Sequence, residues 1–361
     1  SNNFKSKSKK IFTIKRKNIR NLVSEVSSRF YDQKPKNIIA ITGTNGKTSV
    51  ADLFYQILSL NNVPAASIGT LGVKYNNKII KTGLTSPDTI SIHKYLQKLK
   101  ENKIDNVIIE TSSHGLSQYR IHHINFKAAV FTNFSQDHLD YHKNMKSYLN
   151  AKLILFKKIL SKKSNVVLDK SIKEFPILKR IVKNRKLRLK EISKTVEKIK
   201  HFSMDNDSEF KTKNLAMAIL SAKLCGLPDN KIYTSLKKIK EVNGRLELVK
   251  QFPNNVKVFI DYAHTPDALL KILKFLKNKF GKKISLVFGC GGDRDKKKRP
   301  MMAKVANKYS NKIYITDDNP RNELPKKIRN ELARKISKKE YFNIGNRAKA
   351  IKKAIINSEP N

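Results

Sequence analysis

A glycine-rich loop between an apolar strand and a helix constrains the fold of this chain most. The run Gly43-Thr44-Asn45-Gly46-Lys47-Thr48 follows apolar residues 38–41 and precedes a helical pattern over residues 48–61. In such a unit the glycines let backbone amides approach phosphate oxygens, the helix N-terminus adds positive charge, and the lysine and threonine can bind phosphate and Mg²⁺. The strict spacing would place a glycine at position 41, where the chain has isoleucine. The loop is therefore a variant form, and its context predicts a nucleotide-binding α/β domain.

Further short apolar runs extend this pattern along the chain. Residues 107–109, 128–131 and 165–168 predict strands separated by helical stretches, which favours a mostly parallel sheet. A second alternating series predicts strands at 256–260, 284–288 and 312–315 and helices at 268–279 and 300–309. We expect a linker or remnant over residues 1–35, weakly helical from 19 to 31. A P-loop-type central ATPase domain should span 36–242 and a Rossmann-like α/β domain 243–361, with 178–200 an irregular excursion.

The formal net charge of +47 would normally suggest a nucleic-acid partner. The lysines are spread along the whole chain together with many asparagines and isoleucines, as an AT-rich coding sequence would produce, so we expect no nucleic-acid partner. A basic nucleic-acid-binding module stays the alternative from another functional class. Two cysteines, Cys225 and Cys290, are typical of a reducing cytosol. No apolar run approaches the about 18 residues of a membrane span.

Polar clusters follow the predicted strands, where open α/β sheets bind ligands. Glu110 ends one strand and could hold a metal ion shared with ATP phosphates. His138 follows another and could bind metal, with Asp137 and Asp140 positioning it. In the second half, three clusters follow strands in the same way: Asp261-Tyr262-Ala263-His264-Thr265-Pro266-Asp267, Gly289-Cys290-Gly291-Gly292-Asp293-Arg294-Asp295 and Asp317-Asp318-Asn319-Pro320-Arg321.

Taken together, these motifs resemble the Mur ligase family of peptidoglycan synthesis, in particular the branch that adds the third residue of the stem peptide. The resemblance runs from about residue 19 to the last residues. It is carried by Thr42-Gly43-Thr44-Asn45-Gly46-Lys47-Thr48, Thr111-Ser112-Ser113-His114-Gly115-Leu116, Asp137-His138-Leu139-Asp140-Tyr141-His142, Gly244-Arg245-Leu246-Glu247 and the Asp261 to Asp267 cluster.

The resemblance implies ATP and Mg²⁺ as cofactors and assigns their residues. Lys47, Glu110, His138 and Lys152 would be catalytic. Lys152 stands where the family carries a carbamylated lysine, and in that form it would join Thr48, Glu110 and His138 around Mg²⁺. The expected ATP-binding residues are Gly43, Thr44, Asn45, Gly46, Lys47, Thr48, Ser49, Asn214, Arg245, Asp261 and His264.

The same resemblance implies the two other substrates. Thr85, Ser86, Ser112, Gln118 and Arg120 would bind UDP-MurNAc-dipeptide. In this family Asp-Asn-Pro-Arg goes with meso-diaminopimelate, because the arginine can pair with its extra carboxylate. The expected diaminopimelate-binding residues are Arg294, Asp318, Asn319, Pro320 and Arg321.

The implied reaction passes through an acyl phosphate, in a monomeric enzyme of the bacterial cytoplasm. A lysine-adding or a folylpolyglutamate-type ligase remains the enzymatic alternative. Family members also carry a separate uridine-binding domain before this region and a Gly-Lys-Gly-His-Glu segment beyond position 356. We therefore expect a truncated copy lacking part of each substrate site, and an inactive fragment is a further alternative.

Overall fold

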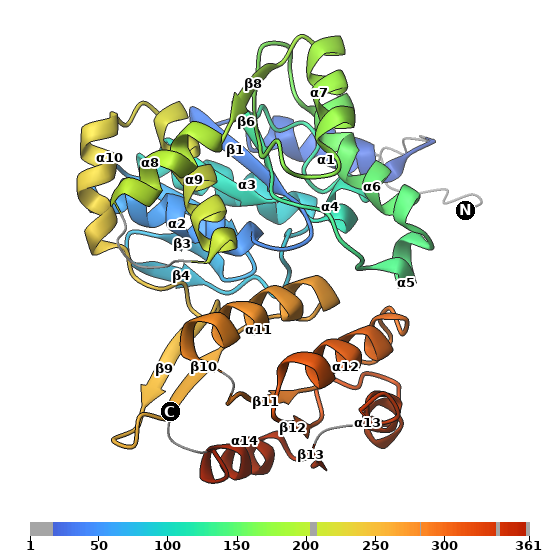
Figure 1. Cartoon of the computed structure of the whole chain (residues 1–361). Helices are drawn as coiled ribbons and strands as arrows, with labels where there is room; N and C mark the ends of the chain where they lie inside the picture. Colours follow the sequence, from blue (N-terminus) through green and yellow to red (C-terminus); the bar gives the residue numbers. More distant parts are fainter. Residues whose placement is uncertain (1–16, 203–207, 282, 337–339, 359–361) are drawn as a thin grey trace.

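An eight-stranded sheet organises the first two thirds of the chain (Figure 1). The computed structural model describes residues 17–202, 208–281, 283–336 and 340–358. The strand order is β4-β3-β2-β5-β1-β6-β7-β8. The strands β2, β5, β1, β6, β7 and β8 are parallel to one another. The strands are β1 (Asn37–Thr42), β2 (Ala65–Gly69), β3 (Gly72–Tyr75), β4 (Lys78–Ile80), β5 (Asn106–Glu110), β6 (Ala128–Phe131), β7 (Asn165–Leu168) and β8 (Arg188–Glu191).

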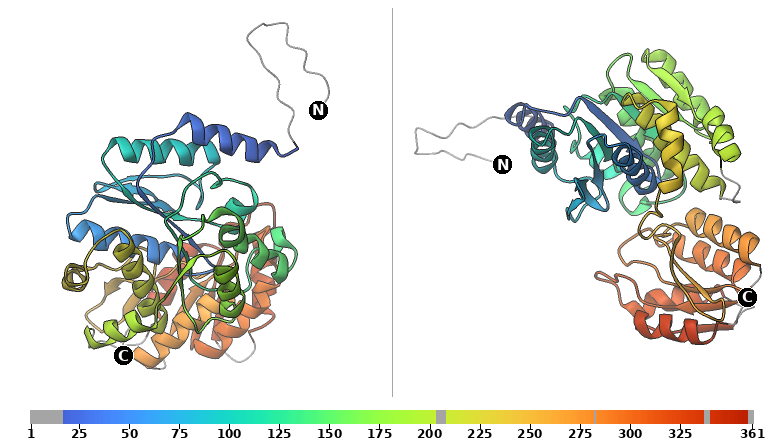
Figure 2. Two further views of the ribbon diagram at one scale, coloured as in Figure 1. Left: turned by 90° about the horizontal axis from the view of Figure 1, so that it is seen from above. Right: turned by 90° about the vertical axis from the view of Figure 1, so that its left-hand side faces the viewer.

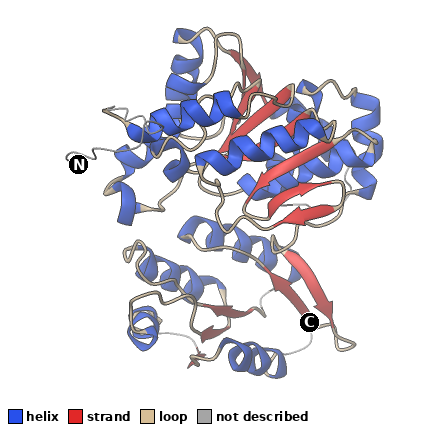
Figure 3. Cartoon of the chain, turned by 180° about the vertical axis from the view of Figure 1, so that it is seen from behind, coloured by secondary structure: helices blue, strands red, loops and turns tan. Residues whose placement is uncertain are grey.

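Helices cover both faces of this sheet (Figures 2 and 3). Alternate residues of β1 enter different cores, because successive side chains of a strand point to opposite faces. Ile38 packs in the cluster that contains Leu96 of α3, whereas Ile39 packs in the cluster that contains Phe54 of α2. The helices are α1 (Ile19–Phe30), α2 (Lys47–Leu60), α3 (Thr89–Glu101), α4 (Ser113–Ser117), α5 (Leu139–His142), α6 (Met145–Ile154) with the π-helical turn η1 (Leu155–Ile159), α7 (Phe175–Asn184), α8 (Ser193–Phe202), α9 (Glu209–Leu224) and α10 (Asp229–Ser235) with the 3₁₀ turn η2 (Leu236–Lys238).

A smaller α/β unit follows. Its parallel sheet has the order β11 (Ser285–Phe288), β12 (Lys312–Ile315) and β13 (Glu340–Asn343). Its helices are α11 (Pro266–Phe280), α12 (Lys298–Tyr309), α13 (Pro325–Ala333) and α14 (Arg347–Ile356). Thr265 caps α11 by accepting a hydrogen bond from the amide of Ala268, and Pro266 occupies the first turn, where its missing N–H costs nothing. The predicted α/β fold with a mostly parallel central sheet is confirmed.

Two sequence predictions need correction in detail. Residues 178–200 are no irregular excursion: they contain most of α7, all of β8 and much of α8, and β8 pairs with β7 as a regular parallel strand. The strand predicted at 256–260 forms β10 (Lys257–Ile260), but it pairs antiparallel with β9 (Glu247–Gln251) in a separate ribbon. The helix expected over residues 19–31 is present as α1, which packs against α3 and donates a hydrogen bond from Ser24 Oγ to the carbonyl of His122.

The joint between the two units lies between η2 and β9, where the chain passes α2. The side-chain amide of Gln56 donates to the carbonyl of Lys240 at 3.2 Å and accepts from its amide at 2.8 Å. This pair of hydrogen bonds fixes Lys240 to the central unit, so the chain can turn only after it. Across the part of the chain that the structure describes, no helix has both the length and the apolar character to cross a membrane.

Candidate active site

The phosphate-binding loop leaves β1 and enters α2 with glycine where backbone geometry and space require it. Gly46 has φ +85°, and a Cβ there would lie 2.6 Å from the side-chain oxygen of Asn214. A Cβ on Gly43, at φ +146°, would collide with the hydroxyl of Thr132. The segment after β6 holds the loop in place, since the amide of Thr44 donates to the carbonyl of Asn133 at 2.9 Å. Asn214, predicted near the nucleotide, thus packs directly on the loop.

Glu110 and Thr48 meet beside this loop. Thr48 Oγ1 donates to Glu110 Oε2 at 3.0 Å, and the amide of Thr70 donates to Glu110 Oε1 at 2.9 Å. Burial raises the pKa of Glu110, and the nearby Lys47 opposes that shift. From the second unit, Arg245 Nη2 donates to Thr48 Oγ1 at 3.0 Å. One carboxylate, one hydroxyl and one guanidinium from two units of the fold therefore converge at the start of α2.

Two lysines, the partly buried Lys47 and the fully buried Lys152, converge on the carbonyl of Gly43. Lys47 Nζ donates to it at 3.0 Å and to the carbonyl of Thr44 at 2.8 Å. Lys152 Nζ, on α6, donates to it at 2.7 Å and lies over the ring of Tyr148. Burial, reinforced by the charge of Lys47, holds the pKa of Lys152 well below its usual range. Lys152, 1% exposed, is therefore a buried group of the loop and no ordinary surface lysine.

His138 lies beside Asp137, where the central unit meets the second unit. It has φ +53°, and its Nε2 lies 3.3 Å from Asp137 Oδ2. The same carboxylate oxygen lies 3.2 Å from Nε2 of His264, which comes from the second unit. Asp261 stays within that unit and accepts hydrogen bonds from the amides of Leu246 and Ala263. Among the described residues, no three histidine, cysteine, aspartate or glutamate side chains converge as a metal-ligand set.

The five residues predicted for the UDP-linked substrate belong to one hydrogen-bonded patch. Ser86 Oγ donates to Ser112 Oγ at 3.1 Å, and Arg120 donates to the carbonyl of Ser86 at 2.8 Å and to Gln118 Oε1 at 2.6 Å. Thr85 Oγ1 lies 3.1 Å from Thr70 Oγ1, which in turn donates to Glu110. The patch is therefore continuous with the loop through Thr70 and Glu110.

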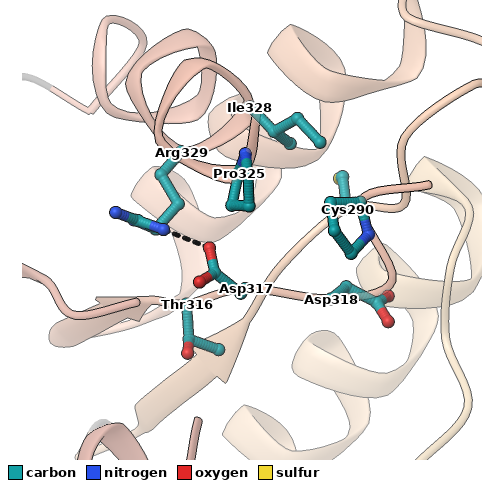
Figure 4. A pocket seen from close by; sticks show the side chains of 8 residues that line it. Cys290, Thr316, Asp317, Asp318, Pro325, Ile328 and Arg329 are labelled. Atoms are coloured by element: carbon teal, nitrogen blue, oxygen red, sulfur yellow. Dashed lines mark hydrogen bonds and ion pairs between the residues drawn. The ribbon is translucent and has the colours of Figure 1, made fainter. Parts of the chain in front are cut away.

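The residues predicted for the amino acid lie on two loops of the second unit. Arg321 Nη1 donates to the carbonyl of Gly292 at 2.7 Å, and the amide of Arg321 donates to Asn319 Oδ1 at 3.2 Å. Arg294 also lies near Gly291, on the first of these loops, and reaches Asp140 of the central unit at 3.6 Å. Asp318 and Pro320 line a neighbouring pocket, where Arg329 pairs with Asp317 (Figure 4).

Four residues of this centre escaped the sequence analysis. Thr70 lies in the turn after β2, and Thr132 donates to the carbonyl of Asn45 at 2.6 Å. No motif points to either. Lys298 and Arg299 are both buried in the first turn of α12, and they end the run Lys296-Lys297-Lys298-Arg299. In a chain with 76 lysines and arginines, such a run gives no signal of its own.

Comparison with known proteins agrees with this geometry. The model of the Mur ligase middle domain matches residues 41–228, and that of the Mur ligase, glutamate ligase domain matches residues 244–361. The UDP-N-acetylmuramoyl-L-alanyl-D-glutamate--2,6-diaminopimelate ligase of Rickettsia bellii (strain RML369-C) is 41% identical over 94% of this chain and 76% of its own length. The enzyme of the same name from Rhizobium meliloti (strain 1021) is 34% identical over 93% of this chain and 73% of its own length.

Solved structures give the same result at the level of the fold. A structure of UDP-N-acetylmuramoyl-L-alanyl-D-glutamate--2,6-diaminopimelate ligase superposes with a TM-score of 0.62 at 26% identity, covering 95% of this chain and 76% of the other. A bifunctional folylpolyglutamate synthase/dihydrofolate synthase from Yersinia pestis superposes with a TM-score of 0.75, covering 96% of this chain and 89% of its own. At 16% identity that likeness concerns the fold alone. Because both family models match and the relatives align over most of the chain, this protein belongs to the Mur ligase family.

Proposed function

We propose that this chain joins meso-diaminopimelate to UDP-MurNAc-L-Ala-D-Glu at the expense of ATP, as a step of peptidoglycan synthesis. The observation that carries the proposal is the pair of arginine side chains beside Gly291, Arg294 and Arg321, the second of them in an Asp-Asn-Pro-Arg run. Diaminopimelate has one carboxylate more than lysine, and a guanidinium binds a carboxylate through parallel hydrogen bonds. The relatives at 41% and 34% identity are named for 2,6-diaminopimelate.

The loop residues suit the triphosphate of ATP. The amides of residues 43–49 lead into the N-terminus of α2, and the ammonium group of Lys47 lies over the loop. Both features neutralise phosphate charge. Arg245 brings a further positive charge to the same place from the second unit. We therefore expect the reaction to require that the second unit be closed against the central one.

The oxygen atoms beside the loop suit a hard divalent cation, for which we propose Mg²⁺. Thr48 Oγ1 and the carboxylate of Glu110 are a donor set that Mg²⁺ prefers, and the carbamate of a modified Lys152 would add two oxygens. His138 would complete the set after turning away from Asp137. When bound, the ion would neutralise phosphate charge and orient the γ-phosphate.

The reaction then follows from position. The carboxylate of the D-glutamyl group, held by the patch around Ser86 and Arg120, attacks the γ-phosphate of ATP and gives an acyl phosphate and ADP. The amine of diaminopimelate, held by the loops of Arg294 and Arg321, attacks the acyl carbon, and phosphate leaves. The chain contributes mainly orientation and charge neutralisation. We expect it to act as a monomer in the bacterial cytoplasm, without nucleic acid.

The deciding experiment measures ADP release with ATP, Mg²⁺ and UDP-MurNAc-L-Ala-D-Glu, offering meso-diaminopimelate, L-lysine or no amino acid. We expect turnover that depends on diaminopimelate and exceeds that with lysine by about a hundredfold or more, since a site built to pair with a charged group rejects the analogue that lacks it. A preference for lysine would reassign the substrate, and no turnover with either amino acid would refute the proposal for this chain. A folate acceptor with glutamate tests the folylpolyglutamate alternative in the same assay.

A further inference from the structure

The segment of residues 136–140 reaches across to the second unit at several points. Gln136 Nε2 donates to Asp295 Oδ2 at 2.9 Å, and Asp140 lies 3.6 Å from Arg294. Between them, the carboxylate of Asp137 binds two side chains of the second unit, Lys298 at 2.6 Å and His264 at 3.2 Å. We call Asp137, His264 and Lys298 the clasp.

Burial separates the Asp137–Lys298 pair of the clasp from the contacts beside it. Asp137 is 2% exposed and Lys298 is 8% exposed. By contrast, the side chains of His264 and Arg294 are 46% and 45% exposed, so their contacts with Asp137 and Asp140 are screened by water and contribute less. Removing one partner from a buried charge pair leaves the other charge desolvated and unpaired, which is costly. The clasp therefore contributes most to holding the two units together along this segment.

We propose that Asp137 is a positioning residue that holds the second domain closed over the phosphate loop by gripping Lys298 and His264. The inference rests on the proposed function and adds to it the residue that keeps the two halves of the site in register. Asp137 follows β6 in the central unit, whereas Lys298 begins α12 and His264 precedes α11, so the clasp ties two helices of the second unit to one strand end. In the same arrangement Arg245 Nη2 donates to Thr48 Oγ1 at 3.0 Å.

The first turn of α12 also connects the clasp to the amino-acid loops. Arg299, next to Lys298, is 1% exposed. Its guanidinium pairs with Glu323 at 2.8 Å and Glu331 at 2.8 Å and donates to the carbonyl of Gly291 at 3.3 Å. The adjacent residues Lys298 and Arg299 thus bind different parts of the molecule. Lys298 binds Asp137 of the central unit, and Arg299 binds the loop that carries Arg294. Loss of the clasp should therefore impair use of the amino acid as well as closure.

The test compares Asp137→Asn and Lys298→Met with a matched control. Asp169→Asn removes a charge from a similarly buried aspartate, 4% exposed, whose partner Lys213 lies 2.9 Å away within the central unit. Small-angle X-ray scattering of each protein with a non-hydrolysable ATP analogue and Mg²⁺ reports closure without turnover. We expect a larger radius of gyration for both clasp variants and a wild-type value for Asp169→Asn.

Kinetics supply the second readout. We expect both clasp variants to lower kcat by about tenfold to a hundredfold and to raise KM for the amino acid, with a smaller rise in KM for ATP, because the loop itself stays intact while Arg245 is withdrawn. The double variant should lose no more than the worse single variant, since the two side chains act as one pair. Asp137→Asn also disturbs His138, so Lys298→Met, which alters only the second unit, separates the two effects.

The outcomes distinguish the inference from the proposed function. Wild-type scattering profiles for both variants, or losses in kcat that multiply in the double variant, would overturn the clasp even in an active enzyme. An inactive wild-type chain whose scattering still changes with Lys298→Met would refute the proposed reaction and leave the clasp standing. Thermal unfolding checks that each variant folds. Should Asp137→Asn not fold, Lys298→Met decides alone.

Discussion

Lys152 lies buried beside Lys47, and the two ammonium groups disfavour each other in the absence of water. The pKa of Lys152 is well below its usual range, so the amine is available in its neutral, nucleophilic form. We expect it to take up CO₂ as a carbamate, which would place a negative charge beside Lys47 at the phosphate-binding loop. Nuclear magnetic resonance after addition of ¹³C-bicarbonate should show one carbamate signal, and Lys152→Ala should remove it and lower kcat at least about a hundredfold. Lys157→Ala, an exposed lysine just beyond the same helix, is the control; a signal that survives Lys152→Ala would contradict the assignment.

Arg321 is held in place by the carbonyl of Gly292, so its remaining donors are fixed in direction. We expect Arg321→Ala to lower kcat/KM for meso-diaminopimelate by about a hundredfold or more, through loss of a charge-assisted pair. Discrimination between meso-diaminopimelate and L-lysine should fall by the same factor, because lysine lacks the carboxylate that pairs with Arg321. Competition between the two amino acids measures the change. Arg334→Ala, an exposed arginine of the same unit, should behave as wild type, and retained discrimination in Arg321→Ala would contradict the role.

At the scale of single residues, the sequence pointed to those site residues that belong to recognisable motifs. The loop, Glu110, Asn214 and the patch around Ser86 come together as the motif order suggested. Lys298 could not be found in this way, because its significance comes from burial against Asp137, a residue 161 positions away. In a chain this rich in lysine, neither type nor spacing separates a buried cation from an exposed one.

At the scale of elements, a buried histidine of α3, which packs against α1, leads us to predict how stability depends on pH. His93 of α3 is fully buried, and neither ring nitrogen has a hydrogen-bond partner. Burial, with a smaller effect of the nearby Lys34, lowers the pKa of His93 from 6.5 to about 4. The unfolded chain therefore binds a proton near pH 6.5 that the folded chain refuses, so stability declines as the pH falls from about 6.5 to about 4 and is fully retained above that window.

The shift in His93 corresponds to about 3 kcal/mol between the ends of this window, at about 1.4 kcal/mol per pKa unit. We expect His93→Leu to flatten the pH dependence of the unfolding free energy by an amount of that order, and to leave stability at pH 8 little changed or improved, since no hydrogen bond is lost. Urea unfolding at pH 8, 6 and 5 measures it. Parallel pH profiles for wild type and variant would contradict this account.

The elements themselves were predictable where a buried parallel strand gives a continuous apolar run. β1, β5, β6 and β7 are nearly or wholly buried, and each was expected. β2, β3, β4 and β8 were not predicted. β2 is buried but reads Ala-Ala-Ser-Ile-Gly, which is no continuous run of large apolar residues. β4 and β8 lie at the sheet edges, and β8 reads Arg-Leu-Lys-Glu, with alternating exposure and two cations. Edge strands are half-solvated, and charge on them protects against pairing with other chains. Their sequence therefore resembles that of a loop.

At the scale of the whole molecule, closure depends on contacts that no single segment encodes. Arg245 meets Thr48, and the clasp joins Asp137 to Lys298, across 197 and 161 positions respectively. The joint also depends on a long-range contact, since Gln56 fixes Lys240 across 184 positions and Gly244 follows with φ +65°. The sequence predicts a domain boundary near residues 241–243, whereas the register of the two domains required the three-dimensional structure.

The excess of positive charge makes a prediction for the whole molecule. A net charge of +47 should attract ATP and the UDP-linked substrate, both of which are multiply anionic, and salt should weaken that attraction. We expect kcat/KM for these two substrates to fall by about threefold to tenfold between 0.05 and 0.5 M salt, mostly through KM. meso-Diaminopimelate carries two positive and two negative charges near neutral pH, so its KM should hardly change and serves as an internal control. An equal fall for all three substrates would instead point to a general effect of salt on closure, because steering acts only on net charge.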